Sequence, residues 1–186
     1  MTSFKFLSCF KCLAVAAGVA AVTGVGFLYS GLYPMGADDH HNDLTYWALE
    51  TLRERSVDRA SSGIEVPADL DRSERLLAGG ADYNDMCAGC HLKPGKDESD
   101  FTLGLNPAPP NLTQPHQGEE DLESRAQHRF WVIKHGIKAS GMPAWGPNHD
   151  DERIWSMVAF LRRLPELSPE QYQVLTARGS AEAPHH

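Results

Sequence analysis

Uncharged residues run without interruption from position 12 to position 37, and apolar side chains dominate residues 13–33. That apolar stretch is 21 residues long. At about 1.5 Å per residue, a helix of this length crosses the roughly 30 Å hydrocarbon core of a bilayer. The pattern therefore predicts one N-terminal transmembrane helix. A cleaved secretory signal is the alternative, because Ala14, Val15 and Ala16 offer a small-x-small cleavage site.

Basic residues flank the apolar stretch unequally. Lys5 and Lys11 precede it, whereas the first lysine or arginine after it is Arg53. Positive charge near a span is retained on the cytoplasmic side, so the N-terminus stays inside and the remainder of the chain is exported. The sequence thus predicts a single-pass protein of the inner (cytoplasmic) membrane, with its C-terminal part on the periplasmic or extracytoplasmic side.

Beyond the span, four stretches show the apolar spacing of amphipathic helices, and alternating charges accompany the first of them. They are residues 38–61, 73–86, 128–137 and 150–164. Ser73 is the predicted N-cap of the second, and residues 64–71, which include Pro67, are an extended linker. We expect an all-α fold with an anchor or signal at 1–36, a membrane-proximal helix and linker at 37–72, a helical domain at 73–177 and a flexible tail at 178–186.

Composition narrows the class of protein. The 186 residues are 41% hydrophobic and 23% charged, which fits one folded domain with appendages and excludes wholesale disorder. The net charge is −8, and it becomes −10 from Asp38 onward because Lys5 and Lys11 are the only charged residues ahead of that position. Such a chain lacks the basic face that a nucleic-acid binder needs. The adjacent His40 and His41 have no third metal ligand in sequence and are interpreted as a solvated pair.

The four cysteines form two close pairs. Cys9 and Cys12 stand at the membrane edge without a second ligand pair, and we interpret them as small apolar residues. The second pair belongs to Cys87-Ala88-Gly89-Cys90-His91. This is C-x-x-C-H, the attachment signature of c-type haem, in which two thiols form thioether bonds and the histidine reaches the iron.

Two other interpretations of this motif fit less well. A zinc site would need a second Cys/His pair, but the chain has no cysteine after Cys90. Thioredoxin-like redox chemistry would need a preceding strand, where the pattern predicts a helix. The sequence therefore predicts one covalent haem c, attached through Cys87 and Cys90, with His91 as an iron ligand.

The sixth position of the iron could be filled by a methionine, by a histidine or by nothing. Met142 is flanked by helix breakers between Gly141 and Gly146 and has little packing reason to be there. Met157 follows the apolar period of the last helix, so we interpret it as a core residue. Met86 adjoins Cys87 and is committed to the helix that precedes the haem. The histidine candidates are His116, His128, His135 and His149. We predict that Met142 is the ligand, with His135 as its strongest histidine rival.

From about residue 73 to residue 164 the chain resembles the class I c-type cytochromes. The matching features are Gly80, Tyr83, Cys87 to His91, Pro110-Asn111-Leu112, Met142-Pro143 and the final helix with Trp155. The resemblance implies an all-α, cytochrome c-like domain at 73–177 around one covalent haem. It implies that the Pro110 carbonyl accepts a hydrogen bond from the second ring nitrogen of His91. It also implies that Gly80 and Trp155 mark the place where the first and last helices of the domain, predicted at residues 73–86 and 150–164, cross. Residues 93–100 are a charged insert that departs from the family's pattern.

An iron with both axial positions filled has no place for a substrate, so we expect a one-electron carrier and not an enzyme. Its negative charge favours redox partner proteins with a basic docking face. Two alternatives stay open. The chain could be the haem-bearing electron-transfer subunit of a larger dehydrogenase or oxidase, docked by residues 38–61, or a haem sensor with a labile sixth ligand.

Overall fold

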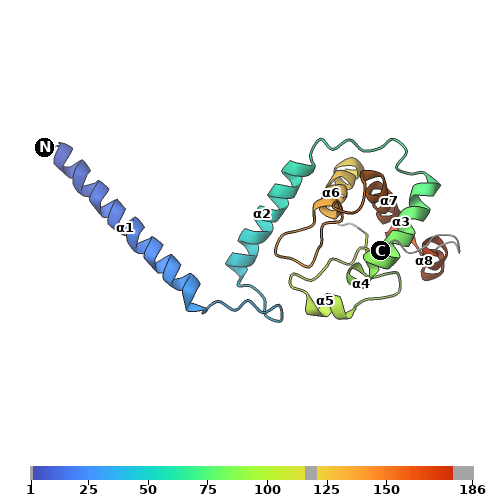
Figure 1. Cartoon of the computed structure of the whole chain (residues 1–186), viewed down its shortest axis with the longest axis horizontal. Coiled ribbons are helices and arrows are strands. Elements are labelled where there is room, and N and C mark those ends of the chain that lie inside the picture. The colour runs from blue at the N-terminus through green and yellow to red at the C-terminus, as the bar shows by residue number, and fades with distance from the viewer. Residues whose placement is uncertain (1, 116–120, 178–186) are drawn as a thin grey trace. The chain divides into compact units, whose positions relative to one another are not determined.

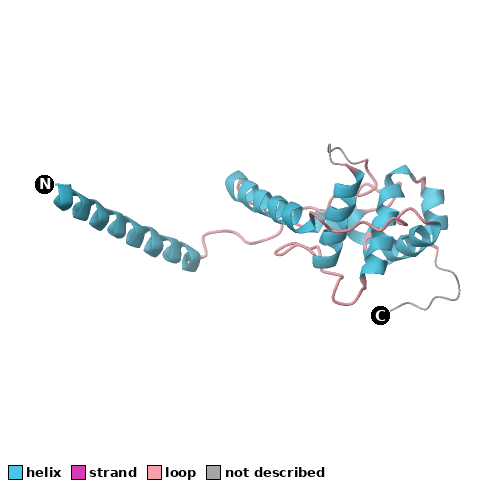
Figure 2. Cartoon of the chain, turned by 90° about the horizontal axis from the view of Figure 1, so that it is seen from above, coloured by secondary structure: helices cyan, strands magenta, loops and turns pink. Residues whose placement is uncertain are grey.

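The computed structural model describes residues 2–115 and 121–177, with side chains from Lys11 onward. Every regular element in that part of the chain is a helix, which confirms the predicted fold class (Figure 2). The chain divides into two compact units, the first ending at Asp39 and the second starting at His40. The predicted tail, residues 178–186, lies outside the described residues.

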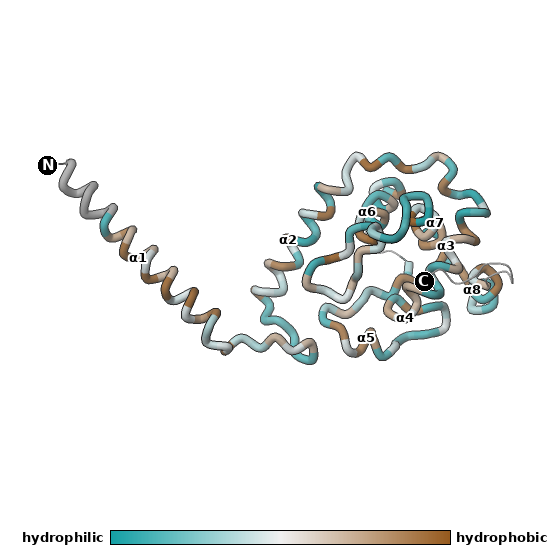
Figure 3. Tube along the Cα trace, in the orientation of Figure 1, coloured by the Kyte–Doolittle hydropathy of each residue, from teal (hydrophilic) through white to brown (hydrophobic). Residues whose placement is uncertain are grey.

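The first unit consists mainly of α1 (Thr2–Ser30), whose apolar stretch is visible in Figure 3. Its segment Lys11–Ser30 is long and apolar enough to cross a membrane, a criterion that a signal sequence also meets. The helix ends three residues before the predicted end of the apolar stretch. The hydroxyl of Ser30 donates to the carbonyl of Phe27 at 2.7 Å, and Gly31 then takes a left-handed conformation (φ 65°) that stops the helix.

The second unit begins with α2 (Asp43–Ser61). The predicted start at residue 38 was wrong by five positions. Asn42 is the N-cap, and its side chain accepts a bond from the backbone N–H of Thr45 at 3.0 Å. The charged residues ahead of Asn42, Asp38 and Asp39, therefore belong to a loop, because a capping side chain fixes the first turn more strongly than periodicity does.

Four helices build the core of this unit: α3 (Ser73–Met86), α6 (Leu122–His135), α7 (Asp151–Arg163) and α8 (Pro169–Thr176) (Figure 1). All eight residues from Ile154 to Leu161 in α7 are buried, so this helix is the centre of the domain. The ring of Trp155 stacks on that of Phe130 from α6 at 4.2 Å between centroids. Ser73 is the first residue of α3 and not its cap; Arg72 occupies the cap position without a side-chain bond.

Backbone contact between α3 and α7 depends on Gly79. A Cβ atom there would overlap the carbonyl group of Ser156, whereas one at Gly80 would lie 2.7 Å from the carbonyl oxygen of Leu175 in α8 and 3.0 Å from the Phe160 ring. Gly79 therefore makes the closest approach of the two helices. The expectation that Gly80 and Trp155 mark that crossing holds in part for Gly80, which lies against the Phe160 side chain of α7 as well as the backbone of α8. The ring of Trp155 instead stacks on α6.

A partly buried ion pair also joins α3 to α7. Arg153 donates through Nε and Nη2 to the two carboxylate oxygens of Asp82, at 2.7 and 2.8 Å. Asp82 is only 6% exposed. A two-point contact of this kind fixes both the spacing and the rotation of the helices.

Several elements had no counterpart in the sequence prediction. They are α4 (Ala88–His91), α5 (Asp100–Gly104), the 3-10 turn Leu164–Glu166 and α8. In addition, α6 begins at Leu122, six residues before the predicted start at 128, because the Asp121 carboxylate caps it through the N–H groups of Glu123 and Ser124. The final long helix spans Asp151–Arg163 with Asp150 as its cap, within one residue of the prediction at each end.

Candidate haem site

The C-x-x-C-H residues form one helical turn. The carbonyl oxygen of Cys87 accepts bonds from the backbone N–H groups of Cys90, at 3.1 Å, and His91, at 2.8 Å. Both cysteines are half-buried, and neither is in a disulfide. Burial raises the pKa of the Cys87 thiol to about 12. The turn thus presents two thiols and one imidazole.

The imidazole of His91 is oriented by a loop 19 residues further along the chain. Its Nδ1 lies 2.9 Å from the carbonyl oxygen of Pro110. A carbonyl only accepts, so Nδ1 carries the proton and Nε2 keeps the lone pair that a metal requires. Burial lowers the pKa of His91, and the bond to Pro110 opposes that change only in part. The neutral, ligating form of the ring is therefore favoured.

The exit from this turn is fixed by Tyr83 of α3. Its hydroxyl lies 2.6 Å from the carbonyl oxygen of Leu92 and 3.2 Å from that of His91. Leu92 is buried and has a positive φ of 68°, a conformation that costs on the order of 1 kcal/mol for a residue with a side chain. Burial raises the pKa of Tyr83, so the hydroxyl stays a donor and holds this conformation in place.

The loop between α6 and α7 folds back along the end of α6. The N–H of Trp145 donates to the carbonyl of Ile133 at 3.0 Å, and that of Gly146 to the carbonyl of Lys134 at 2.9 Å. Gly136 has a φ of 64°, and a Cβ there would lie 2.7 Å from the Ala144 nitrogen. Glycine is therefore required where the loop reverses direction.

Met142 sits within this loop on a backbone that is bonded on both sides. Its N–H donates to the hydroxyl of Ser140 at 3.1 Å, and its carbonyl accepts from the N–H of Ile137 at 3.1 Å. The side chain is half-buried and packs against the main core cluster. A loop methionine held in this way presents its sulfur from a fixed backbone.

One core cluster collects the separate parts of the predicted site. Cys87, Leu112, Met142 and Trp145 all pack partly buried against it. The N–H of Leu112 also donates to the carbonyl of His91 at 3.2 Å. The structure therefore brings three segments to the same core: the attachment turn (residues 87–91), the loop between α5 and α6 that contains Pro110 (the Pro110 loop), and the loop between α6 and α7 that contains Met142 (the Met142 loop). In sequence, 55 positions separate Cys87 from Met142.

The histidines weighed as rivals have other neighbours. Nδ1 of His128 lies 3.7 Å from a carboxylate oxygen of Asp58 in α2, and the exposed His135 tilts against Trp131 at 4.9 Å between centroids. His149 packs on Trp145, and its Nε2 lies 3.2 Å from the sulfur of Met86. His116 lies outside the described residues.

The donor set fits a haem of the c type. Two thiols on one helical turn match the two thioether bonds, and an imidazole whose Nδ1 is already bonded offers Nε2 to iron. A soft thioether in a loop packed on the same core is a suitable second axial donor. The core cluster against which Cys87 and Met142 pack is apolar, which suits a largely apolar macrocycle.

Two hydrogen bonds that support the C-x-x-C-H turn were not predicted from the sequence. The motif pattern marked Tyr83 only as an aromatic residue, and nothing in it predicted that the hydroxyl would reach the carbonyl of Leu92. Ser99 donates to the carbonyl of Gly89 at 2.7 Å and caps α5 together with Thr102. The sequence feature that indicates this cap is Ser-Asp-Phe-Thr, a serine followed three residues later by a second hydroxyl residue. It begins at the end of the charged insert, residues 93–100.

Comparison with known families gives one match, and it covers the site. Residues 74–161 match the family described as cytochrome C oxidase, cbb3-type, subunit III. No curated protein and no solved structure matches the chain significantly. The matched segment contains the attachment turn, the Pro110 loop, the Met142 loop and most of α7. Residues 74–161 are therefore similar to a c-type cytochrome domain.

Proposed function

We propose that this chain is a membrane-tethered monohaem cytochrome that carries single electrons between redox partners of the periplasm or the membrane. Haem-based electron transfer is the activity that the family match supports. The observation that carries the finer proposal is the C-x-x-C-H turn with the Nδ1 of His91 bonded to Pro110 at 2.9 Å. The role is that of an electron carrier and not of an enzyme.

Cys87 and Cys90 hold the haem covalently in this proposal, and His91 binds its iron through Nε2. When bound, haem c supplies one-electron exchange between the ferric and ferrous states. The Pro110 carbonyl fixes the plane of the His91 ring and makes it a stronger donor, as partners of metal-bound histidines generally do. The chain has one C-x-x-C-H sequence, so it carries one such group.

Met142 is the proposed second axial ligand. With His91 and Met142 both holding the iron, no coordination site would be left for a substrate. Thioether sulfur is a poor donor to ferric iron, so it favours the reduced state and raises the potential relative to two histidines. The apolar core acts in the same direction, because burial penalises the extra positive charge of the ferric form.

We assign the tether to α1, with the C-terminal domain on the periplasmic face of the inner membrane. The support is the apolar segment Lys11–Ser30 and the basic residues that precede it. The charge of −10 beyond residue 37 favours a partner with a basic docking face. Lys134, next to the Met142 loop, is paired with Asp151 at 2.6 Å, so its charge does not oppose that preference.

A second function is favoured by the family description. The matched family is named for a subunit of a cbb3-type oxidase. The chain would then be the electron-transfer subunit of a larger complex, with the same residues holding the haem. Co-purification of the chain from native membranes with a catalytic subunit would distinguish this role from that of a separate carrier.

A redox titration with spectra of both oxidation states tests the proposed carrier. We expect a single one-electron wave, the ferric absorption band of sulfur-ligated haem near the red edge of the visible range, and no spectral change when carbon monoxide is added to the reduced protein at neutral pH. A filled sixth position excludes that ligand. Rapid carbon monoxide binding would refute the closed site and support a ligand sensor instead.

A further inference from the structure

Helix α2 consists of two halves with different chemistry. Residues 44–52 contain a single charged side chain, that of Glu50. Residues 53–61 contain five, namely Arg53, Glu54, Arg55, Asp58 and Arg59. An ordinary surface helix distributes its apolar residues along one face. Here the apolar residues are concentrated at one end, so the two ends of α2 are suited to different environments.

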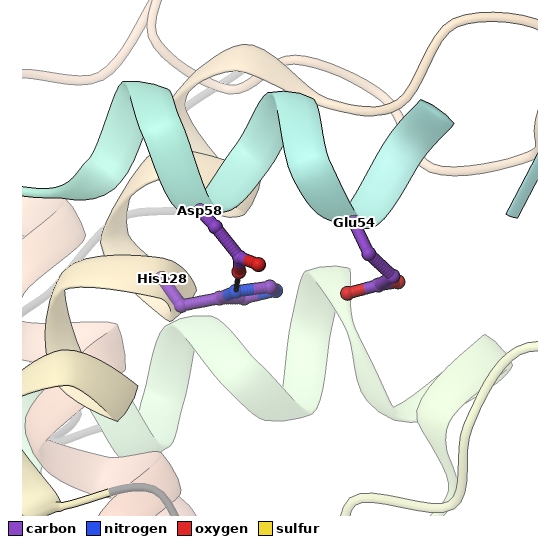
Figure 4. Close-up of side chains that lie close together, drawn as sticks. All are labelled: Glu54, Asp58 and His128. Carbon is purple, nitrogen blue, oxygen red and sulfur yellow. Dashed lines mark ion pairs between the residues drawn. The ribbon is translucent and has the colours of Figure 1, made fainter. Parts of the chain in front are cut away.

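The charged half attaches α2 to the cytochrome domain. Val57 and Ser61 are buried there, only 3% and 4% exposed. His128 of α6 faces Asp58 and Glu54 across the helix contact, with its Nδ1 3.7 Å from an Asp58 oxygen (Figure 4). These three side chains have the donors of a metal site, but the guanidinium of Arg53 already bonds Glu54 at 2.8 Å. We therefore treat the group as a polar helix contact.

The apolar half stays largely uncovered. Its large side chains share high exposure, at 71% for Leu44, 43% for Tyr46, 62% for Trp47, 51% for Leu49 and 67% for Leu52. Five large apolar residues within nine positions, distributed around the helix, make this half an apolar segment that water solvates poorly. Single apolar residues on a protein surface need no explanation, but several large ones exposed in one short segment mark an interaction site.

The chain itself limits what can cover this apolar segment. Only residues 31–42 separate the end of α1 from the start of α2. Twelve residues span at most about 40 Å when fully extended, so the apolar half of α2 cannot move far from the membrane in which α1 is anchored. Its end nearest the anchor carries Tyr46 and Trp47, the two residue types enriched where a bilayer meets water.

We propose that residues 44–52 lie in the interfacial layer of the bilayer, with Leu44, Trp47, Leu49 and Leu52 against the acyl chains. This inference rests on the proposed tether. The occupant is a lipid surface rather than a partner protein, because the bilayer is within reach of every copy of the chain. Asp38, Asp39 and Asp43 flank the apolar segment and disfavour anionic headgroups, so zwitterionic lipid is the expected contact. A helix that lies at this depth holds its attached domain at the membrane surface.

Thiol accessibility in the haem-loaded full chain tests the proposal. Single cysteines are introduced as Leu44→Cys or Leu49→Cys, with Ser56→Cys in the charged half as the matched control, in a background with Cys9 and Cys12 replaced by serine. Each protein is reconstituted into phosphatidylcholine vesicles and treated with a charged maleimide. We expect labelling at positions 44 and 49 to be on the order of tenfold slower than at 56, because the reagent is excluded from lipid and the thiolate is disfavoured there.

Equal rates at all three positions would overturn the proposal and leave the apolar segment for a partner protein. Protection at 44 and 49 that vanishes when the lipid-to-protein ratio is raised would also overturn it, because a second copy would then be the cover. Loss of the chain from the vesicles in an alkaline carbonate wash would refute the tether and this inference together. Retained protein with equal rates refutes the inference alone.

Discussion

Replacing Met142 with histidine is expected to leave the haem attached and to lower its reduction potential by on the order of 0.1 V, because imidazole nitrogen stabilises ferric iron better than thioether sulfur does. The ferric band of sulfur ligation should disappear in the same variant. Met142→Ala should also remove the band and lower the potential, and it would open the sixth position to external ligands. A spectroelectrochemical titration of the purified protein measures both the potential and the band.

Met86→Leu is the matched control for this experiment. Met86 is half-buried and adjoins the attachment turn, so it is the other methionine near the proposed haem. A leucine there conserves volume and apolar character, and we expect the potential and the ferric band to stay near those of the unmodified protein. If Met142→His kept the band and Met86→Leu lost it, the axial ligand would be Met86 and the role proposed for the Met142 loop would be wrong.

The Gly79→Ala substitution is expected to lower the free energy of unfolding by about 3 kcal/mol, the upper range for overpacking a rigid contact. The new methyl group would overlap the carbonyl of Ser156. Backbone cannot rotate away as a side chain can, and the two-point contact of Arg153 with Asp82 resists separation of α3 from α7. Guanidinium denaturation of the haem-loaded protein, followed by far-UV circular dichroism, measures the effect.

Gly104→Ala serves as the control for helix propensity. A Cβ at Gly104 meets nothing within 4 Å, and alanine is favoured over glycine in a helix by about 1 kcal/mol. That variant should therefore be as stable as the unmodified chain or slightly more so. Equal stability of the Gly79→Ala and Gly104→Ala variants would show that α3 and α7 are not in backbone contact.

The sequence predicts local features well where a residue type or motif has few structural roles. C-x-x-C-H predicts a haem site because two thiols and an imidazole at that spacing match that cofactor. The position of Met142 between Gly141 and Pro143 indicated a loop, because glycine and proline both interrupt helices. The long helix around Trp155 was predicted to within one residue at each end, because its apolar period continues over more than three turns.

Short and tertiary features were harder to predict. Helix α8 has eight residues, of which only Tyr172 and Thr176 are buried. Two buried positions are too few to give a recognisable helical period. The feature that indicates this helix is its capping sequence, Ser168 followed by Pro169 and Gln171. Gly79 and Gly80 look equivalent in sequence. Which of them meets the backbone of α7 depends on the rotation of α3 about its axis, and the contacts of the whole domain fix that rotation.

Covalent attachment of one haem through Cys87 and Cys90 is the central proposal for this protein, and acid-acetone extraction with intact-mass spectrometry tests it directly. The protein is produced in a host that exports and matures c-type cytochromes. We predict that the colour stays with the polypeptide and that its mass exceeds the sequence mass by one haem, whereas the Cys87→Ser, Cys90→Ser double variant loses both. Pigment that passes into the acetone, or a polypeptide of unmodified mass, would contradict the proposal.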